Sequence, residues 1–575
     1  MDFKKLPTTP QEILNLTWTE LEPYAKELES RPLTAANVKQ WLLDWTALSD
    51  RISDLSSRLY LATTVNTEDK QAEQSYEEFL DNMYPAAMNA EQKLKVKLLA
   101  SGLQTGGFEI PLRNMRSEAD LFREENLPLQ SEQIKLNMTY DKIIGSQSVK
   151  WEGEEYTISQ IKQKIHNPDR SVREKVWRAI IERQMADRKS INELWQQYMK
   201  IRGKLAANAG LPSYREYSWR RHLRFDYSPK DCQTFHQAIE KVVVPAAKRI
   251  YERRRQELGL DRLRPWDLSD GWFDRPVEAA GKMQLKPFES IEEFQQKTAA
   301  IFEQVDPQLG GYFRAMLAEK AMDLENRKHK APGAYCISFD VSRKPFIFMN
   351  AVGRHEDVHT LLHESGHAFH TFESSKLPYA QQLVVPMEFN EVASMAMELL
   401  AAPYLTKESG GFYTEAEAAQ ARIEHLEGEI LFWPFMAVVD AFQHWVYENP
   451  QAGNDPQNCD AKWTELWQRF IPAVDWSGLE EERMTGWHRK LHIHQAPFYY
   501  IEYGLAQLGA VQIFANAIQD QKRAVANYRK ALALGGKVTL PELYATAGGK
   551  FGFDVDTVQK AVTVMEDTID TLRKI

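Results

Sequence analysis

The chain has 575 residues, a formal net charge of −10 at pH 7, 43% hydrophobic and 26% charged residues. This is the composition of a globular protein, and its length allows one large domain or two to four ordinary ones. The acidic balance argues against a nucleic-acid partner, which usually requires a basic face. The longest apolar run, residues 430–439, is too short to cross a bilayer and contains Pro434, so we expect a buried helix and no membrane partner.

The cysteines and the N-terminus indicate a reducing compartment. Only Cys232, Cys336 and Cys459 occur, and none belongs to a CxxC pair. A sparse, odd set of this kind is typical of free thiols. Residues 1–7 lead into polar sequence without an apolar signal core, so we expect a cytoplasmic protein.

Helical patterning dominates the first part of the chain. Residues 34–100 carry apolar side chains at three- and four-residue spacing, which predicts two long helices in a hairpin or arm. We therefore expect an N-terminal helical arm over residues 1–115. A second helical region over residues 116–575 would then carry the candidate site.

Short β elements interrupt the helical pattern at two places. One is expected at 149–158, with a turn at Glu152-Gly153, and a helix body follows at 172–185. The Asp-, Pro-, Gly- and Trp-rich stretch 260–285 is typical of a structured loop. Residues 334–339 and 345–349 predict two strands joined by a turn, and helices again fill 380–575. The expected fold class is mainly α, with a small β-sheet next to the helix that follows residue 349.

That helix carries the pattern His363-Glu364-Ser365-Gly366-His367. A spacing of four places both rings on one helix face, with Cβ atoms roughly 5–6 Å apart. Both imidazoles can then bind one Zn²⁺, and Glu364 is turned aside enough to act as a general base on water rather than as a ligand. Gly366 is a poor helix former, so we expect close packing at this point.

A catalytic zinc site needs a third protein ligand and an open fourth position. Glu391 lies 24 residues after His367 in a helical pattern that begins after Pro386, and it is our choice for this ligand. Glu388 is a geometric alternative, although its place in the first turn suits a helix-start charge. The other candidates near the motif are His355, His359 and His370, of which His359 would extend a three-histidine ridge.

Two acidic residues are candidates for orienting a histidine ligand through its second ring nitrogen. They are Glu398, which shares a face with Glu391, and Asp357, which precedes the motif. Either could instead be an ordinary ion-pair partner.

The segment from Trp487 to Gly504 holds a third cluster, with three histidines and three tyrosines around Pro497. Hydrolysis of a peptide bond passes through a tetrahedral oxyanion, which a neutral donor such as Tyr or His stabilises. Tyr500 and Tyr503 share a helical face, as do Tyr499 and Tyr503. The alternative is an aromatic core stripe whose hydroxyls are satisfied by the backbone.

Together these segments resemble the oligoendopeptidase F branch of the thimet-oligopeptidase family of zinc peptidases. The resemblance runs from about Asn167 to the C-terminus, is strongest at 345–347, 357–370, 389–398 and 497–509, and is weak before about residue 115. It implies a helical gluzincin fold of two lobes around a deep central channel. It also implies oligopeptide substrates and one zinc ion per chain.

Carried over by position, the resemblance makes His363, His367 and Glu391 the metal ligands and Glu364 the general base. It makes Tyr500 and Tyr503 the substrate- and oxyanion-binding tyrosines. His492 is our choice for the substrate-binding histidine, with His494 close in register. The sequence departs from the thimet-type pattern at Gln495-Ala496, where that branch has Gly-Tyr, so the tyrosine of that loop has no counterpart.

The expected function is zinc-dependent cleavage of internal bonds in short peptides. Two alternatives stay open at this stage. One is an exopeptidase, which needs a charge clamp for a peptide end, and no single Arg or Lys stands out for this role. The other is a peptide-binding protein with a closed, structural zinc site. Neither the oligomeric state nor the preferred side chains follow from the sequence.

Overall fold

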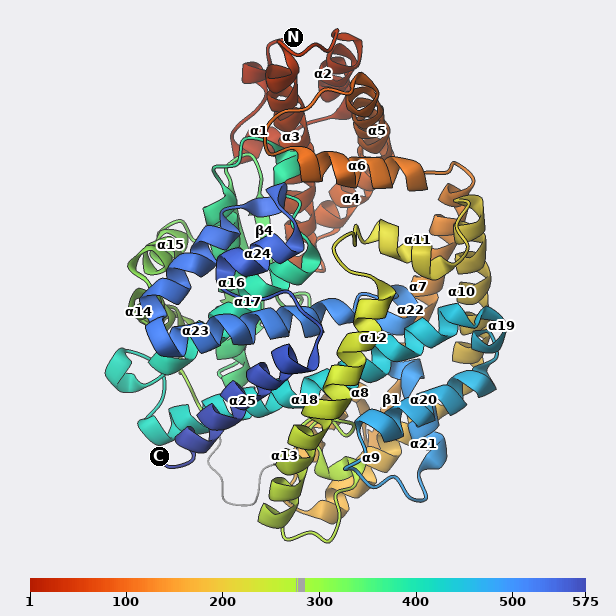
Figure 1. The fold of residues 1–575 in the computed structure, drawn as a ribbon, viewed down its shortest axis with the longest axis vertical. Helices are drawn as coiled ribbons and strands as arrows, with labels where there is room; N and C mark the ends of the chain where they lie inside the picture. The colour runs from red at the N-terminus through yellow and green to blue at the C-terminus, as the bar shows by residue number, and fades with distance from the viewer. Residues whose placement is uncertain (276, 278–284) are drawn as a thin grey trace. The chain divides into compact units, whose positions relative to one another are not determined.

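The computed structural model describes residues 1–275, 277 and 285–575. Helices dominate it, and strands form only two small sheets (Figure 1). The chain divides into two compact units. Unit 1 comprises residues 1–119, 285–418 and 509–551, and unit 2 comprises 120–284, 419–508 and 552–575. Both units are thus assembled from segments far apart in the sequence, and the division expected at residue 115 stays a prediction.

Unit 1 contains a helical N-terminal part and a sheet backed by helices. Its elements are α1 (Pro10–Leu14), α2 (Trp18–Ser30), α3 (Val38–Val65), α4 (Lys70–Glu78), α5 (Tyr84–Ser101), α6 (Glu109–Leu121), α14 (Ile291–Val305), α15 (Pro307–Ala318), β3 (Met322–Glu325), β4 (Tyr335–Phe339), β5 (Lys344–Ala351), α16 (His355–Ser374), α17 (Met387–Ala401), α24 (Leu540–Ala547) and most of α23 (Ile501–Leu532).

Unit 2 is almost wholly helical. Its elements are α7 (Asn126–Gly145), β1 (Ser148–Trp151), β2 (Glu154–Thr157), α8 (Ile158–Lys162), α9 (Arg170–Met185), α10 (Arg188–Asn208), α11 (Tyr214–Arg221), α12 (Pro229–Ala238), α13 (Val244–Glu257), most of α18 (Glu415–Glu448), α19 (Pro450–Gly453), α20 (Pro456–Phe470), α21 (Glu480–Met484), the 3₁₀ turn η9 (Gly486–Arg489), α22 (Leu491–Gln495) and α25 (Val555–Leu572).

The N-terminal helices follow the periodicity of the sequence. Helix α3 is one long element, and α4, the π turn η2 (Phe79–Met83) and α5 run on from one another over residues 70–101. Their apolar faces form a core that includes Trp41 and Trp45, both fully buried, with ring centroids 5.1 Å apart. The prediction of two long helical stretches over residues 34–100 is confirmed.

The larger sheet has the strand order β3-β5-β4. Strands β4 and β5 are antiparallel and match the two predicted strands, whereas β3, which pairs parallel with β5, was not predicted. Helix α16 packs against β4, β5 and α17, and Figure 1 shows α16 and α17 lying side by side. The small sheet therefore lies next to the motif helix, as expected.

The other predicted β element is a two-stranded hairpin. Strands β1 and β2 pair antiparallel, with Trp151 opposite Glu154. Glu152 and Gly153 form the two-residue turn with φ values of 52° and 91°. Positive φ at both positions gives the twist that suits such hairpins, which explains the glycine.

Two further expectations concern apolar and loop segments. Residues 430–439 lie within α18, where Ile430, Trp433 and Val439 are fully buried. Among the helices of the described residues, none combines the length and apolar character needed to cross a membrane. The expected loop at 260–285 contains one 3₁₀ turn, Pro265–Asp267, in its described part, while residues 276 and 278–284 lie outside the described residues.

Candidate metal centre

The side chain of Asp357 caps the N-terminus of helix α16. The Oδ2 atom of Asp357 accepts the backbone N–H groups of Val352, at 2.8 Å, and of Arg354, at 2.9 Å. These groups would otherwise be unsatisfied at the helix N-terminus. Asp357 therefore fixes the start of the motif helix, and its role in orienting a histidine stays a prediction.

Gly366 lets α16 approach α17 closely. A Cβ atom at this position would lie 2.5 Å from the carbonyl oxygen of Ala393 and 2.6 Å from the Cα atom of Ser394. Both neighbours are backbone atoms, so a side chain here would push the two helices apart. The close packing expected from this glycine is confirmed, and it brings the ligand-bearing faces of the two helices together.

His363, His367 and Glu391 form one of the compact groups of potential metal-ligand atoms among the described residues, with these atoms all within 4.8 Å of one another. The Oε2 atom of Glu391 lies 3.4 Å from Nε2 of His363 and 3.9 Å from Nε2 of His367. Ligand atoms about 2.0–2.1 Å from a tetrahedral zinc are roughly 3.3–3.5 Å apart. The donor set thus fits zinc with little adjustment.

The carboxylate of Glu398 contacts Nδ1 of the first histidine ligand, His363. Its Oε1 atom lies 2.8 Å from Nδ1 of His363, and its Oε2 atom lies 3.6 Å from Nδ1 of His359. An Nδ1–H bonded to a carboxylate leaves Nε2 of the same ring as the ligand atom, which is the usual arrangement behind metal-binding histidines. The structure therefore favours the orienting role among the two considered for Glu398.

The charges of the site also suit a cation. Burial opposes a charge on His363, but its hydrogen bonds to Glu391 and Glu398 hold its pKa well above the ordinary value. Burial lowers the pKa of His367 to about 4, and the neighbouring charge on His363 acts in the same direction. Two carboxylates facing two rings, of which one is neutral, form a place in which positive charge is stabilised.

Glu364 is 7% exposed and is not one of the three clustered ligands. Burial raises the pKa of Glu364 to about 7, and the carboxylates of Glu391 and Glu398 act in the same direction, while His363 opposes them. A carboxyl group whose pKa lies near neutrality can both take up and release a proton, as a general base requires. Its expected role as the base stays a prediction.

The remaining histidines of the motif helix have other partners. Nε2 of His359 lies 3.1 Å from Nε2 of His355, whose Nδ1 atom lies 2.8 Å from the hydroxyl of Tyr413. Neither ring belongs to the His363 group. His370 is buried, and burial lowers its pKa to about 3. The structure therefore favours the carboxylate of Glu391 over a three-histidine ridge.

The tyrosine segment forms a compact aromatic group in unit 2. The ring centroids of Tyr500 and Tyr503 are 5.7 Å apart. The ring centroid of His492 lies 5.0 Å from that of Tyr500 and 6.0 Å from that of Tyr503. Burial lowers the pKa of His492 to about 4, with Lys490 acting in the same direction, so the ring is a neutral donor near pH 7. The sequence thus identified three residues that do lie together, and their approach to the metal ligands of unit 1 stays a prediction.

His494 is a core residue. It is fully buried and stacks on Tyr140 with a centroid separation of 4.5 Å and on Trp487 at 5.8 Å. Its backbone carbonyl accepts a hydrogen bond from Arg202. A ring enclosed in this way cannot reach a substrate, which favours His492 for the substrate-binding role.

Another group of potential ligand atoms, which the sequence did not predict, lies in unit 2. It consists of Cys232, Asp440 and His444, all buried. Asp440 Oδ2 already lies 2.8 Å from Nε2 of His236 and 3.3 Å from Nε2 of His444. The available signal was the four-residue spacing of Cys232 with His236 and of Asp440 with His444 on their helices. Because all three residues are buried, this group is less accessible to a substrate than the His363 group.

Comparisons with known proteins place the chain in a family. A sequence model described as peptidase family M3 matches residues 164–562, and one described as the peptidase M3 N-terminal domain matches residues 12–106. A protein from Borreliella burgdorferi named as an oligoendopeptidase F homolog is 23% identical over 271 residues, which are 45% of this chain and 43% of that protein. The chain thus spans less than half the length of this curated relative.

Two solved structures resemble the whole chain. A protein described as an oligoendopeptidase F is 26% identical with a TM-score of 0.84, and the match covers 99% of both chains. A Pz peptidase A solved with an inhibitor is 25% identical with a TM-score of 0.84, covering 100% of this chain and 99% of the other.

The chain belongs to peptidase family M3. Its fold is mainly helical with small sheets, like that of the oligoendopeptidase F and Pz peptidase structures, and the expected resemblance is confirmed. The N-terminal match also covers residues for which the sequence alone indicated only a weak resemblance.

Proposed function

We propose that this protein is a zinc-dependent endopeptidase that cleaves internal bonds of short oligopeptides. The observation that carries the proposal is the group of His363, His367 and Glu391, with Glu398 behind the first histidine. The side chains of His363 and His367 are 29% and 24% exposed, so a substrate can reach this group. A reachable three-ligand site is typical of catalytic rather than structural zinc.

A zinc ion at this site supplies Lewis-acid chemistry, which activates water near neutral pH and polarises a carbonyl group. The three ligands would hold the ion. Ser394 Oγ lies 3.2 Å from Oε2 of Glu391 and 2.9 Å from the backbone carbonyl oxygen of the same residue, so it contacts the third ligand at both ends. Glu364 takes the proton of the attacking water and passes it to the leaving amine. Tyr500, Tyr503 and the neutral ring of His492 donate hydrogen bonds to the substrate and to the developing oxyanion.

The sheet beside α16 offers main-chain contacts to an extended peptide. Strand β5 has partners on both sides, so an added strand can pair only with β4 or β3. Of these two outer strands, β4 forms the antiparallel pair with β5 and is our choice for the docking edge. Backbone pairing gives affinity with little sequence preference, which suits an enzyme for varied oligopeptides.

A digest of one peptide of about a dozen residues tests the proposal against both alternatives. We expect internal cuts in the mass spectrum, their loss after treatment with a chelator and their return on addition of zinc. A ladder of products shortened one residue at a time would assign an exopeptidase. Absence of cleavage by the zinc-loaded protein would favour a peptide-binding protein.

A further inference from the structure

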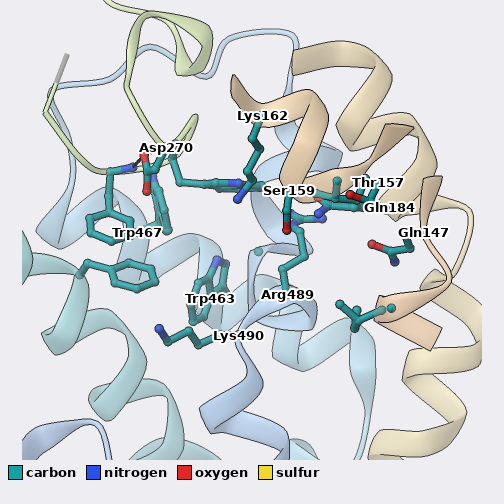
Figure 2. A pocket seen from close by; sticks show the side chains of 17 residues that line it. Gln147, Thr157, Ser159, Lys162, Gln184, Asp270, Trp463, Trp467, Arg489 and Lys490 are labelled. Carbon is teal, nitrogen blue, oxygen red and sulfur yellow. Dashed lines mark hydrogen bonds between the residues drawn. The ribbon is translucent and has the colours of Figure 1, made fainter. Parts of the chain in front are cut away.

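Unit 2 contains a cavity of about 440 Å³ that the metal centre does not use. Its volume lies within the range of small-ligand sites, roughly 300–1,000 Å³. Figure 2 shows Lys162, Asp270, Trp463 and Lys490 around one central space. The aromatic part of the wall comes from α18, α20 and the loop after residue 270, and consists of Trp272, Phe273, Phe435, Trp463 and Trp467.

Three cations line the cavity: Lys162 at the end of α8, Arg489 at the end of η9, and Lys490 before α22. In the part of the chain that the structure describes, none of them has a carboxylate oxygen within 4 Å. The Lys490 Nζ atom lies over the Tyr500 ring at 4.0 Å and over Phe435 at 5.3 Å, and Arg489 lies over Trp272 at 4.2 Å. Burial lowers the pKa of Lys490 to about 8, while the carboxylate of Asp270 acts in the opposite direction.

Among the residues that the structure describes, several polar atoms of the wall are buried without a hydrogen-bond partner. Three of them are donors, namely Nε1 of Trp463, Nε1 of Trp467 and Nε of Arg489. Trp463 and Trp467 are each only 1% exposed. Buried polar groups are rarely left unpaired in folded proteins, so their concentration in one cavity points to a ligand rich in acceptors.

Two of these buried atoms without a partner are acceptors, namely Oε1 of Gln147 and Oε1 of Gln184, whose side chains belong to the same wall. They suit a ligand that also carries an N–H group. A peptide end offers this combination, because its last residue joins a carboxylate to an amide N–H.

The only carboxylate among the described lining residues is that of Asp270. Its Oδ1 atom accepts the backbone N–H groups of Trp272, at 2.8 Å, and of Phe273 and Asp274, both at 3.1 Å. Asp270 is therefore engaged in holding its own turn. One carboxylate against three cations leaves the cavity with an excess of positive charge.

We propose that this cavity binds the C-terminal residue of a peptide. Lys162, Arg489 and Lys490 receive the carboxylate, and the tryptophan and phenylalanine rings enclose an apolar or aromatic side chain. Lys490 also contacts Tyr500, which is proposed above to bind the substrate, so the cavity extends that site. The inference thus rests on the proposed function for its role, although the binding itself requires no turnover.

Calorimetric titration of the zinc-loaded protein tests the proposal with two ligands, N-acetyl-phenylalanine and its C-terminal amide. We expect the free acid to bind at least tenfold more tightly than the amide. In Lys490→Met and Lys162→Met this preference should fall to near one, whereas the control Lys189→Met, whose side chain is 89% exposed, should keep it. Circular dichroism confirms that each variant is folded.

An equal affinity for acid and amide in the unmodified protein would overturn the proposal. A preference that persists in both lysine variants would do so as well, because the carboxylate would then bind elsewhere, for example at the metal. Free phenylalanine, whose ammonium group meets the cations, should bind at least tenfold more weakly than the N-acetyl acid, and equal binding would contradict recognition of a peptide end. The titration measures binding alone, so it tests the proposed cavity even if the peptide digest shows no turnover.

Discussion

Glu398 decides which nitrogen of His363 faces the other two ligands. Its 2.8 Å contact with Nδ1 leaves Nε2 directed toward Glu391. We predict that Glu398→Ala weakens zinc binding by about 10–100-fold, because the ring loses its orientation and some basicity. Glu398→Gln should have a smaller effect, since its amide oxygen can still accept the hydrogen bond.

Competition for zinc against a chelator of known affinity measures this effect. The exposed Glu408, which lies in the same unit, provides the matched control Glu408→Ala. If Glu398→Ala binds zinc as tightly as the control, the contact with His363 is an ordinary ion pair without a role in metal binding.

The roles of the Tyr500 and Tyr503 hydroxyl groups can be tested one at a time by substitution with phenylalanine. We predict that Tyr503→Phe or Tyr500→Phe lowers kcat by roughly 10²–10³-fold with a smaller change in KM, because an oxyanion donor acts mainly in the transition state. Steady-state kinetics on a quenched peptide give both constants. Tyr84→Phe, at a position that is 45% exposed in unit 1, is the control.

If both tyrosine variants keep the kcat of the control, the oxyanion role passes to His492. If only KM rises, the hydroxyls bind substrate without stabilising the transition state.

At the scale of elements, the contact between α16 and α17 depends on a missing side chain. We predict that Gly366→Ala destabilises the protein by about 1–3 kcal/mol, because the added Cβ would meet the backbone of Ala393 and Ser394. Urea unfolding followed by circular dichroism measures the change. In the control Gly311→Ala, on α15, nothing lies within 4 Å of the added atom, so this variant should be neutral or slightly stabilised.

An unchanged unfolding midpoint in Gly366→Ala would mean that the two helices can separate at no cost. The packing argument for the ligand geometry would then fail.

The elements that the sequence predicted well are those with a local signal. Apolar periodicity predicted the N-terminal helices, and the turn signal Glu152-Gly153 predicted the hairpin β1-β2. Strand β3 was missed because it has four residues and pairs in parallel with a partner more than twenty residues further along the chain. Such a pairing leaves no pattern within the strand itself.

The same distinction applies to the candidate site. The spacing of His363 and His367 is a local signal, whereas the roles of Asp357 and His494 depended on backbone and ring partners that no spacing reveals. The cations of the unit 2 cavity come from separate segments, at residues 162 and 489–490. Their proximity therefore depends on the fold and leaves no local pattern in the sequence.

At the scale of the whole molecule, the candidate residues are divided between two compact units. The metal ligands lie in unit 1, and the tyrosine group and the cationic cavity lie in unit 2. The chain enters each unit more than once, and α18 and α23 each contribute residues to both. The sequence could identify these segments singly, but the discontinuous assembly depends on long-range packing.

The central claim is that Glu364 serves as the base for hydrolysis at a zinc ion held by His363, His367 and Glu391. The most direct measurement is the zinc content and the turnover of Glu364→Gln on a quenched peptide, beside Glu356→Gln, an exposed position on the same helix. The account predicts about one zinc per chain in both variants and a loss of turnover of roughly 10²–10⁴-fold in Glu364→Gln alone. Turnover of Glu364→Gln at the rate of the unmodified protein, with zinc retained, would contradict it.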